Sequence, residues 1–205
     1  MGTRDQIIEA ALRLFASNGY KQTTVAAIEA EAGLSPGSGG MYRHFPSKQA
    51  VLEATVSWAE ANAYGPASFD ERLLDTKHPV EALRAAGESA LAATRKASDF
   101  HLALMRTAND QVVDINDVRD RLVVRSYHQF AQWLELFANA GIFRTVDYQA
   151  TAATALGSIV WFHYASVITG ATPSNIDQER FLETWVDQQW TYLRHDGPAI
   201  ADSSS

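Results

Sequence analysis

The sequence has 205 residues, of which 46% are hydrophobic and 20% charged, a composition typical of a globular protein with a sizeable core. It contains no cysteine, which excludes a disulfide framework, a thiolate nucleophile and a cysteine-based metal site. The formal net charge is −7; residues 1–50 hold five Lys or Arg and four Asp or Glu, so they carry +1 and the remainder −8. This asymmetry permits a local basic face on an acidic body, as phosphate binding requires.

The N-terminal stretch MGTRDQIIEAALRLF lacks the basic region, apolar run and cleavage site of a signal peptide, so we expect a cytoplasmic protein. Residues 150–170 are long and apolar enough to suggest a membrane span. Ser, Thr and His side chains interrupt this stretch, however, and no Lys or Arg flanks it. We expect a helix buried in protein, and no membrane partner.

The first 50 residues predict short helices in close succession. Apolar residues at helical spacing predict a first helix that Asn18-Gly19 ends. A second helix follows Thr24 and stops at Ala32-Gly33, and Ser35-Pro36 has the pattern of an N-cap and first position of a third helix. Two short helices joined by a tight turn are typical of a helix-turn-helix motif.

The remaining chain also has helical periodicity, and none of it shows the sustained alternation of a strand. We therefore predict an all-α fold with a helix-turn-helix domain over 1–47 and a helical domain over 48–205. The predicted helices after residue 47 are a linking helix at 48–64, one that begins at Pro79, and segments 99–110, 115–140, 148–169 and 177–194.

The glycine-rich stretch from Gly33 to Phe45 has two alternative interpretations to exclude. A phosphate-binding loop needs G-x-x-x-x-G-K-[ST], or G-x-G-x-x-G after a strand, and neither pattern is present. A plain flexible loop explains the glycines but not the Ser-Pro helix start or the Tyr-Arg-His-Phe cluster. A segment that enters the major groove of DNA explains all three features.

The span from Thr23 to Lys48, TTVAAIEAEAGLSPGSGGMYRHFPSK, resembles the N-terminal domain of the TetR (tetracycline-repressor) family of transcriptional regulators. Together with Phe15, Gly19 and Tyr20 the resemblance covers about a quarter of the chain. It implies an all-α homodimer that binds a palindromic double-stranded DNA operator, with repression as the expected outcome. It also implies a C-terminal domain that binds a small, largely apolar or aromatic effector and forms the dimer.

By position, this resemblance implies that Thr24, Tyr42, His44 and Lys48 hold phosphates and that residues 36–40 face the groove. The expected DNA-binding set is Thr23, Thr24, Ser35, Pro36, Gly37, Ser38, Gly39, Gly40, Tyr42, Arg43, His44 and Lys48. Here two residues more than usual for the family separate Ser35 from Tyr42. Each of the three glycines costs a helix roughly 1 kcal/mol relative to alanine, so a full recognition helix is not expected without DNA.

Aromatic and polar side chains on the later helices are candidates for an effector pocket, because such pockets combine apolar walls with a few polar groups. The candidates are Phe100, His101, Met105, Arg106, Asn109, His128, Trp133, Phe137, Trp161 and Tyr164. The alternative interpretation, that the aromatic residues only form the core, stays open. Broad apolar stripes on the last two helices predict a four-helix dimer interface.

Other classes of protein fit less well. The sequence contains no H-E-x-x-H, G-x-S-x-G or calcium-loop pattern, so we expect no enzyme, no metal site and no cofactor. Two alternatives stay open: a ligand-binding member of the same fold that has lost sequence-specific DNA binding and, with less support, a helical enzyme.

Overall fold

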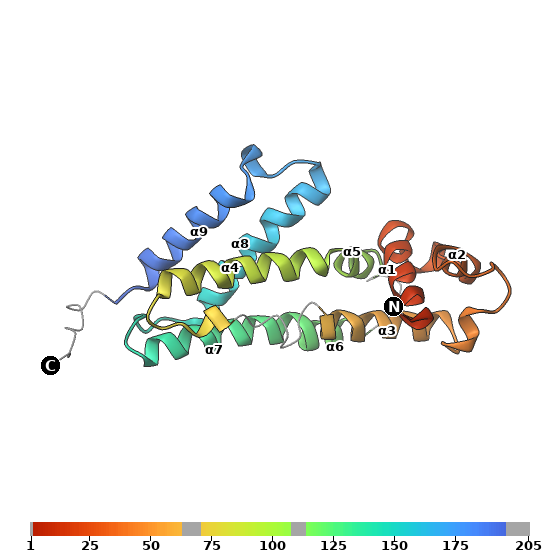
Figure 1. Ribbon diagram of the computed structural model, residues 1–205, viewed down its shortest axis with the longest axis horizontal. Coiled ribbons are helices and arrows are strands. Elements are labelled where there is room, and N and C mark those ends of the chain that lie inside the picture. Colours follow the sequence, from red (N-terminus) through yellow and green to blue (C-terminus); the bar gives the residue numbers. More distant parts are fainter. Residues whose placement is uncertain (1, 63–70, 108–113, 196–205) are drawn as a thin grey trace. The chain divides into compact units, whose positions relative to one another are not determined.

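The structure is a computed structural model that describes residues 2–62, 71–107 and 114–195 (Figure 1). Regular structure in these ranges is helical, and the only strand-like feature there is an isolated antiparallel bridge between Phe143 and Arg194. The predicted all-α fold class is therefore confirmed. The helices are, in order, α1 (Thr3–Gln22), α2 (Val25–Glu31), η1 (Met41–Arg43), α3 (Lys48–Asn62), η3 (Glu71–Leu74), α4 (Pro79–Lys96), α5 (Ser98–Thr107), α6 (Ile115–Val118), η5 (Arg119–Val124), α7 (Arg125–Asn139), α8 (Tyr148–Thr169), η6 (Pro173–Asn175) and α9 (Gln178–Leu193).

The chain forms two compact units that are not contiguous in sequence. The first unit comprises Met1–Ser68 and Ala93–Arg125, and the second comprises Phe69–Ala92 and Ser126–Ser205. This division follows packing, and it differs from the predicted functional boundary at residue 47, which stays a prediction. The last turn of α4 lies in the first unit and the rest of α4 in the second.

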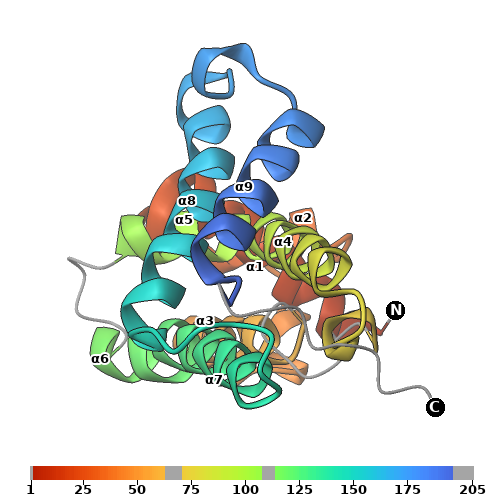
Figure 2. The ribbon, with the colours of Figure 1, turned by 90° about the vertical axis from the view of Figure 1, so that its left-hand side faces the viewer.

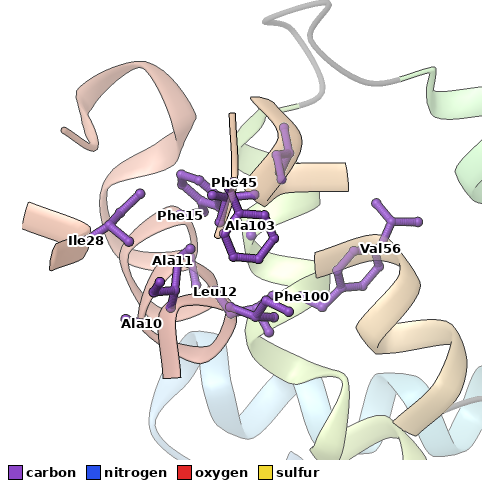
Figure 3. Close-up of a cluster of buried hydrophobic side chains, with 14 of the residues drawn as sticks. Ala10, Ala11, Leu12, Phe15, Ile28, Phe45, Val56, Phe100 and Ala103 are labelled. Atoms are coloured by element: carbon purple, nitrogen blue, oxygen red, sulfur yellow. The ribbon is translucent and has the colours of Figure 1, made fainter. Parts of the chain in front are cut away.

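The first unit has one apolar core, shown in part in Figure 3. Leu12 and Phe15 of α1 meet Phe45, which precedes α3, and Phe100 of α5. Burying a side chain of this size stabilises a fold by about 1.5–3 kcal/mol, so this cluster fixes the helix-turn-helix segment on α1 and α5. Ile28 anchors α2 in the same core.

The second unit is built around stacked aromatic rings. Phe137 of α7 lies 4.6 Å from Trp133 and 5.0 Å from Phe143, measured between ring centroids. Helices α8 and α9 run antiparallel to each other, as Figure 2 shows. They are joined by stacked rings of Phe162 and Phe181, 4.0 Å apart, and by a hydrogen bond of 3.0 Å from Trp185 Nε1 to the carbonyl of Ala155.

Within the described residues, α8 is the helix whose length and hydropathy would suit a membrane crossing. Core helices of soluble proteins meet the same criterion, and α8 packs Ala155, Ile159 and Phe162 into the second unit. Buried residues make up 39% of the apolar window, which leaves much of this helix uncovered. The single chain therefore buries only part of the helix that was expected to be buried in protein, and burial of the rest stays a prediction.

The helices after α3 lie close to the predicted ranges, with one local difference. The predicted segment 115–140 contains a π-helical stretch, Arg119–Val124, between α6 and α7. Residues 63–70 and 108–113 lie outside the described part of the chain, and with them the predicted ends of the helices at 48–64 and 99–110.

Candidate nucleic-acid interface

The joint between α1 and α2 is built by a glycine and two threonines. Gly19 has φ +77°, in the left-handed region that favours glycine, and it turns the chain near the end of α1. Thr23 is buried, and its hydroxyl donates to the carbonyl oxygens of Gly19 at 2.8 Å and Leu14 at 3.2 Å. Thr24 is exposed, and its Oγ1 caps α2 by accepting the Ala27 N–H at 3.1 Å.

The segment after α2 is a compact loop. The helix start indicated by Ser35-Pro36 is therefore wrong, whereas the expectation that the glycines disfavour a full recognition helix without DNA agrees with the structure. Gly37 and Gly39 have φ of +73° and +74°, which a right-handed helix cannot contain. A turn bond joins the Ser38 N–H to the Ser35 carbonyl at 3.2 Å, and the sole helical piece within residues 35–44 is η1, a three-residue 3-10 turn. Glycine favours this path because left-handed backbone carries no side-chain penalty there.

Glu29 of α2 supports this loop from inside, a role that the sequence interpretation missed. Its side chain is fully buried. Oε2 accepts the N–H of Gly37 at 2.6 Å and Oε1 accepts the N–H of Met41 at 3.0 Å. The residue follows Val25 by four positions and precedes Ala32 by three, so its place on the inward face of α2 was a usable signal.

The outer side of the loop presents polar groups. Tyr42 is 56% exposed, and Ser38, Arg43 and His44 are also exposed. Met41 and Phe45, on either side of Tyr42, Arg43 and His44, are buried and hold the segment in the core. The remaining predicted contacts in this segment are likewise exposed or half-buried: Ser35, Pro36, Gly37, Gly39 and Gly40.

Lys48 lies at the start of α3 and is half-buried. Its ammonium group donates to the carbonyl oxygens of Tyr20 and Thr23, each at 2.8 Å, and sits 4.1 Å from the centre of the Tyr20 ring. Burial, and secondarily the negative charge of Glu53, raise the pKa of Tyr20. The structure thus uses Lys48 and Thr23 to fasten α1 to α3, while their predicted contacts with DNA stay a prediction.

Arg4 adds a cation that the sequence interpretation did not select. Its guanidinium carbon lies 4.8 Å from the centre of the Phe45 ring, at the edge of the same region. The side chain is exposed, so the charge is accessible to solvent. Arg4 and Arg43 together can therefore attract a phosphate backbone despite the acidic balance of the whole chain.

The predicted effector residues are divided between the two units. Five belong to the first unit, where Phe100 is core and Met105 is 58% exposed. In the second unit Trp133 and Phe137 are packed among aromatic rings, whereas Trp161 is 62% exposed. The other placements are His101 half-buried, Arg106 exposed, His128 exposed with Gln149 Nε2 at 3.3 Å, Tyr164 buried, and Asn109 outside the described residues.

A surface hollow of about 440 Å³ lies on the second unit, next to the last turns of α9. It is lined by Arg144, Asp187, Gln188, Thr191, Tyr192 and Arg194, none of them an expected effector residue. Arg144 is tied down, since its Nε donates to the Tyr192 carbonyl and its guanidinium lies 4.3 Å from that ring's centre.

Buried side chains fix the segment after α2 in the core, and its polar side chains are exposed. This arrangement is typical of a DNA-binding regulator. Comparison with known proteins agrees: residues 7–55 match the family described as bacterial regulatory proteins, tetR family. The chain belongs to the TetR family of transcriptional regulators.

Relatives and solved structures support the assignment. TcmR of Streptomyces glaucescens is 32% identical over 134 residues, 64% of this chain and 52% of that protein. YerO of Bacillus subtilis is 33% identical over 81 residues, 40% of this chain and 27% of the relative. The chain thus matches about half or less of these relatives' lengths. A regulator from Saccharomonospora viridis, solved in complex with choline, has the same fold with a TM-score of 0.68, 20% identity, and coverage of 94% of this chain and 97% of that one.

Proposed function

We propose that this protein is a cytoplasmic repressor that binds a palindromic DNA operator as a homodimer and is released by a small, largely apolar effector. The observation that carries the proposal is the loop at residues 35–44. Its polar side chains face solvent while Met41 and Phe45 fix it in the core. A polar surface of defined shape on a rigid support is what recognition of DNA requires.

Contacts with DNA would come mainly from hydrogen-bond donors at the loop's end. The Tyr42 hydroxyl and the His44 ring can donate to phosphate oxygens, which position a protein on the duplex. Arg43 can make the bidentate contact that distinguishes guanine in the major groove. Because glycines occupy positions 37, 39 and 40, few side chains reach base edges, and sequence-dependent DNA shape becomes part of the recognition.

The homodimer is proposed from α8 and α9. Trp161 and Ile168 of α8 are 62% and 64% exposed, and Val167 and Tyr192 add further apolar surface. Apolar surface of this kind marks an interaction site when it is contiguous. An interface with two-fold symmetry would match a palindromic operator.

An effector is supported by the likeness in fold to the regulator solved with choline. Which residues line the effector site stays a prediction from the sequence. The signal would reach the DNA-binding loop through α3, whose Glu60 is paired with Arg121 and, at 3.2 Å, with Arg125. An effector can act this way only if it binds one arrangement of α3 more tightly than the other.

The test begins with selection of bound sequences from a random pool of duplexes. Anisotropy is then measured on the selected duplex at several salt concentrations. We expect a palindrome and an affinity that falls steeply with salt. Tyr42→Phe and Arg43→Ala should both weaken binding. Arg43→Ala should also reduce the discrimination between bases at one position of the operator by about 1–3 kcal/mol. Arg95→Ala, which removes an exposed arginine at the end of α4, is the control.

A second candidate function is a ligand-binding member of the same fold that has lost DNA binding. The absence of a regular recognition helix between residues 35 and 44 favours it. Under this alternative, no sequence is enriched and binding does not change with salt.

A further inference from the structure

Glu29 is a fully buried ionisable side chain that the proposed contacts with DNA do not use. A buried carboxylate is unfavourable unless hydrogen bonds replace its lost water. Here each oxygen accepts one backbone N–H, from Gly37 at 2.6 Å and from Met41 at 3.0 Å. Hydrogen bonds to an ionised acceptor are about twice as strong as neutral ones, so this group holds the loop firmly.

The two bonds fix both ends of the segment 37–41. Between them lie Ser38 and two further glycines, a stretch that would otherwise sample many backbone conformations. The backbone of Glu29 contributes again, because its carbonyl accepts the Leu34 N–H at 2.8 Å. The Leu34 side chain closes the inner face, since a Cβ on Gly40 would lie 3.3 Å from its Cδ1.

We propose that Glu29 is a positioning residue for DNA recognition. By holding the amides of Gly37 and Met41, it sets the loop in its binding conformation before DNA arrives, although its carboxylate does not face the DNA. A loop ordered in advance loses less conformational entropy on binding, so the two hydrogen bonds to Glu29 raise the affinity for the operator. This inference rests on the proposed DNA-binding function.

Glutamine is the informative substitution because it keeps the shape of the side chain. An amide presents one acceptor and one donor, so in Glu29→Gln one of the two loop amides faces an N–H group instead of an oxygen. Glu31→Gln is the matched control. Glu31 lies on the same helix, is exposed, pairs with Arg13 at 2.9 Å, and loses the same single charge.

The first measurement is amide hydrogen exchange on free protein. We expect Gly37 and Met41 to exchange about tenfold faster in Glu29→Gln than in Glu31→Gln, corresponding to 1.4 kcal/mol of lost protection. The second is DNA binding at fixed salt. Glu29→Gln should bind the selected duplex about tenfold more weakly than Glu31→Gln. On an unrelated duplex, where phosphate contacts dominate, the two variants should agree within about twofold.

Each outcome decides the inference. If the wild-type protein selects an operator and the two variants bind it equally, the positioning role is overturned while the proposed function stands. If the wild-type protein selects no operator, the proposed function fails and the positioning role with it. In that case faster amide exchange at Gly37 and Met41 in Glu29→Gln shows that the hydrogen bonds to Glu29 have a purely structural role.

A second variant guards against loss of folding in Glu29→Gln. At Gly37 a Cβ would meet nothing within 4 Å, but φ of +73° is unfavourable for alanine. Gly37→Ala therefore disturbs the loop without crowding it. We expect the same selective loss on the operator, and operator binding equal to wild type overturns the inference.

Discussion

Lys48 shows how one side chain can serve the fold where the sequence suggested a ligand contact. Its ammonium group holds the carbonyl oxygens of Tyr20 and Thr23, which lie at the end of α1. Backbone carbonyls left over at a helix end need partners, and a lysine supplies them. The charge is therefore engaged inside the first unit before any phosphate approaches.

Replacing Lys48 by methionine keeps the aliphatic stem and removes both hydrogen bonds. Hydrogen bonds to charged groups contribute roughly 1.5–3 kcal/mol, and the Lys48 side chain is partly exposed. We therefore expect the free energy of unfolding to fall by about 1–2 kcal/mol. Urea denaturation followed by circular dichroism measures this change. Arg43→Met, at an exposed position, is the control and should change stability by less than about 0.5 kcal/mol. Equal losses in both variants would contradict the structural role of Lys48.

His78 and Asp75 form an exposed pair just before α4. His78 Nδ1 lies 2.7 Å from Asp75 Oδ2, and Asp75 Oδ1 accepts the N–H groups of Lys77 and His78 at 3.0 and 3.3 Å. The hydrogen bond to Asp75 raises the pKa of His78 above 6.5, and the same bond lowers the pKa of Asp75 below 3.8. Both charges are therefore present together between these pH values.

The pH dependence of this pair follows from those directions. The His78 contribution to stability is complete below pH 6.5 and is lost as the pH rises through the raised pKa. The Asp75 contribution is complete above pH 3.8 and is lost as the pH falls through the lowered pKa. Titration of the ring protons of His78 by NMR should give a midpoint above 6.5, and Asp75→Asn should return it toward that value. An unchanged midpoint in Asp75→Asn would show that the pair does not persist in solution.

At the scale of helices and loops, local sequence signals predicted most elements. Apolar periodicity with cap residues such as Thr24 and Pro79 located α2 and α4, because these signals act within one turn. The loop at residues 35–44 could not be predicted in the same way. Its path depends on hydrogen bonds that the N–H groups of Gly37 and Met41 donate to Glu29, eight and twelve residues earlier, and these exist only once the first unit has packed. The polar residues named for this site lie together on the exposed loop, and their contacts with DNA stay a prediction. The conformation of the loop and its support by Glu29 were not predicted.

The contact of α4 with α9 depends on the absence of a side chain at Gly87. A Cβ there would lie 3.1 Å from Leu182 Cδ2 and 3.2 Å from the Trp185 ring. Gly87→Val should therefore lower the free energy of unfolding by about 1–3 kcal/mol through overpacking, despite the better helix propensity of valine. Thermal unfolding measures it. Ala92→Val, at an exposed position of α4, is the control and should change stability by at most about 0.7 kcal/mol; an equal effect would refute the close packing.

At the scale of the whole molecule, the exposed aromatic and aliphatic residues of α8 call for an explanation. Trp161 and Ile168 are both more than half exposed on a helix whose opposite face is core. Large side chains rank among the strongest contributors to interfaces when a partner desolvates them. A second copy of this chain is the partner that a palindromic operator requires.

Trp161→Glu tests that assembly directly. A buried unpaired carboxylate at the interface is strongly unfavourable, so we expect the dimer dissociation constant to rise at least about 100-fold, or roughly 2.7 kcal/mol. Sedimentation velocity over a range of concentrations measures the change. Operator affinity should fall in parallel, because each monomer then holds only one half-site, whereas helix content should stay constant. Met105→Glu is the control, because Met105 on α5 is similarly exposed, and this variant should leave the dimer intact. A Trp161→Glu protein that sediments as the wild type does would place the interface elsewhere.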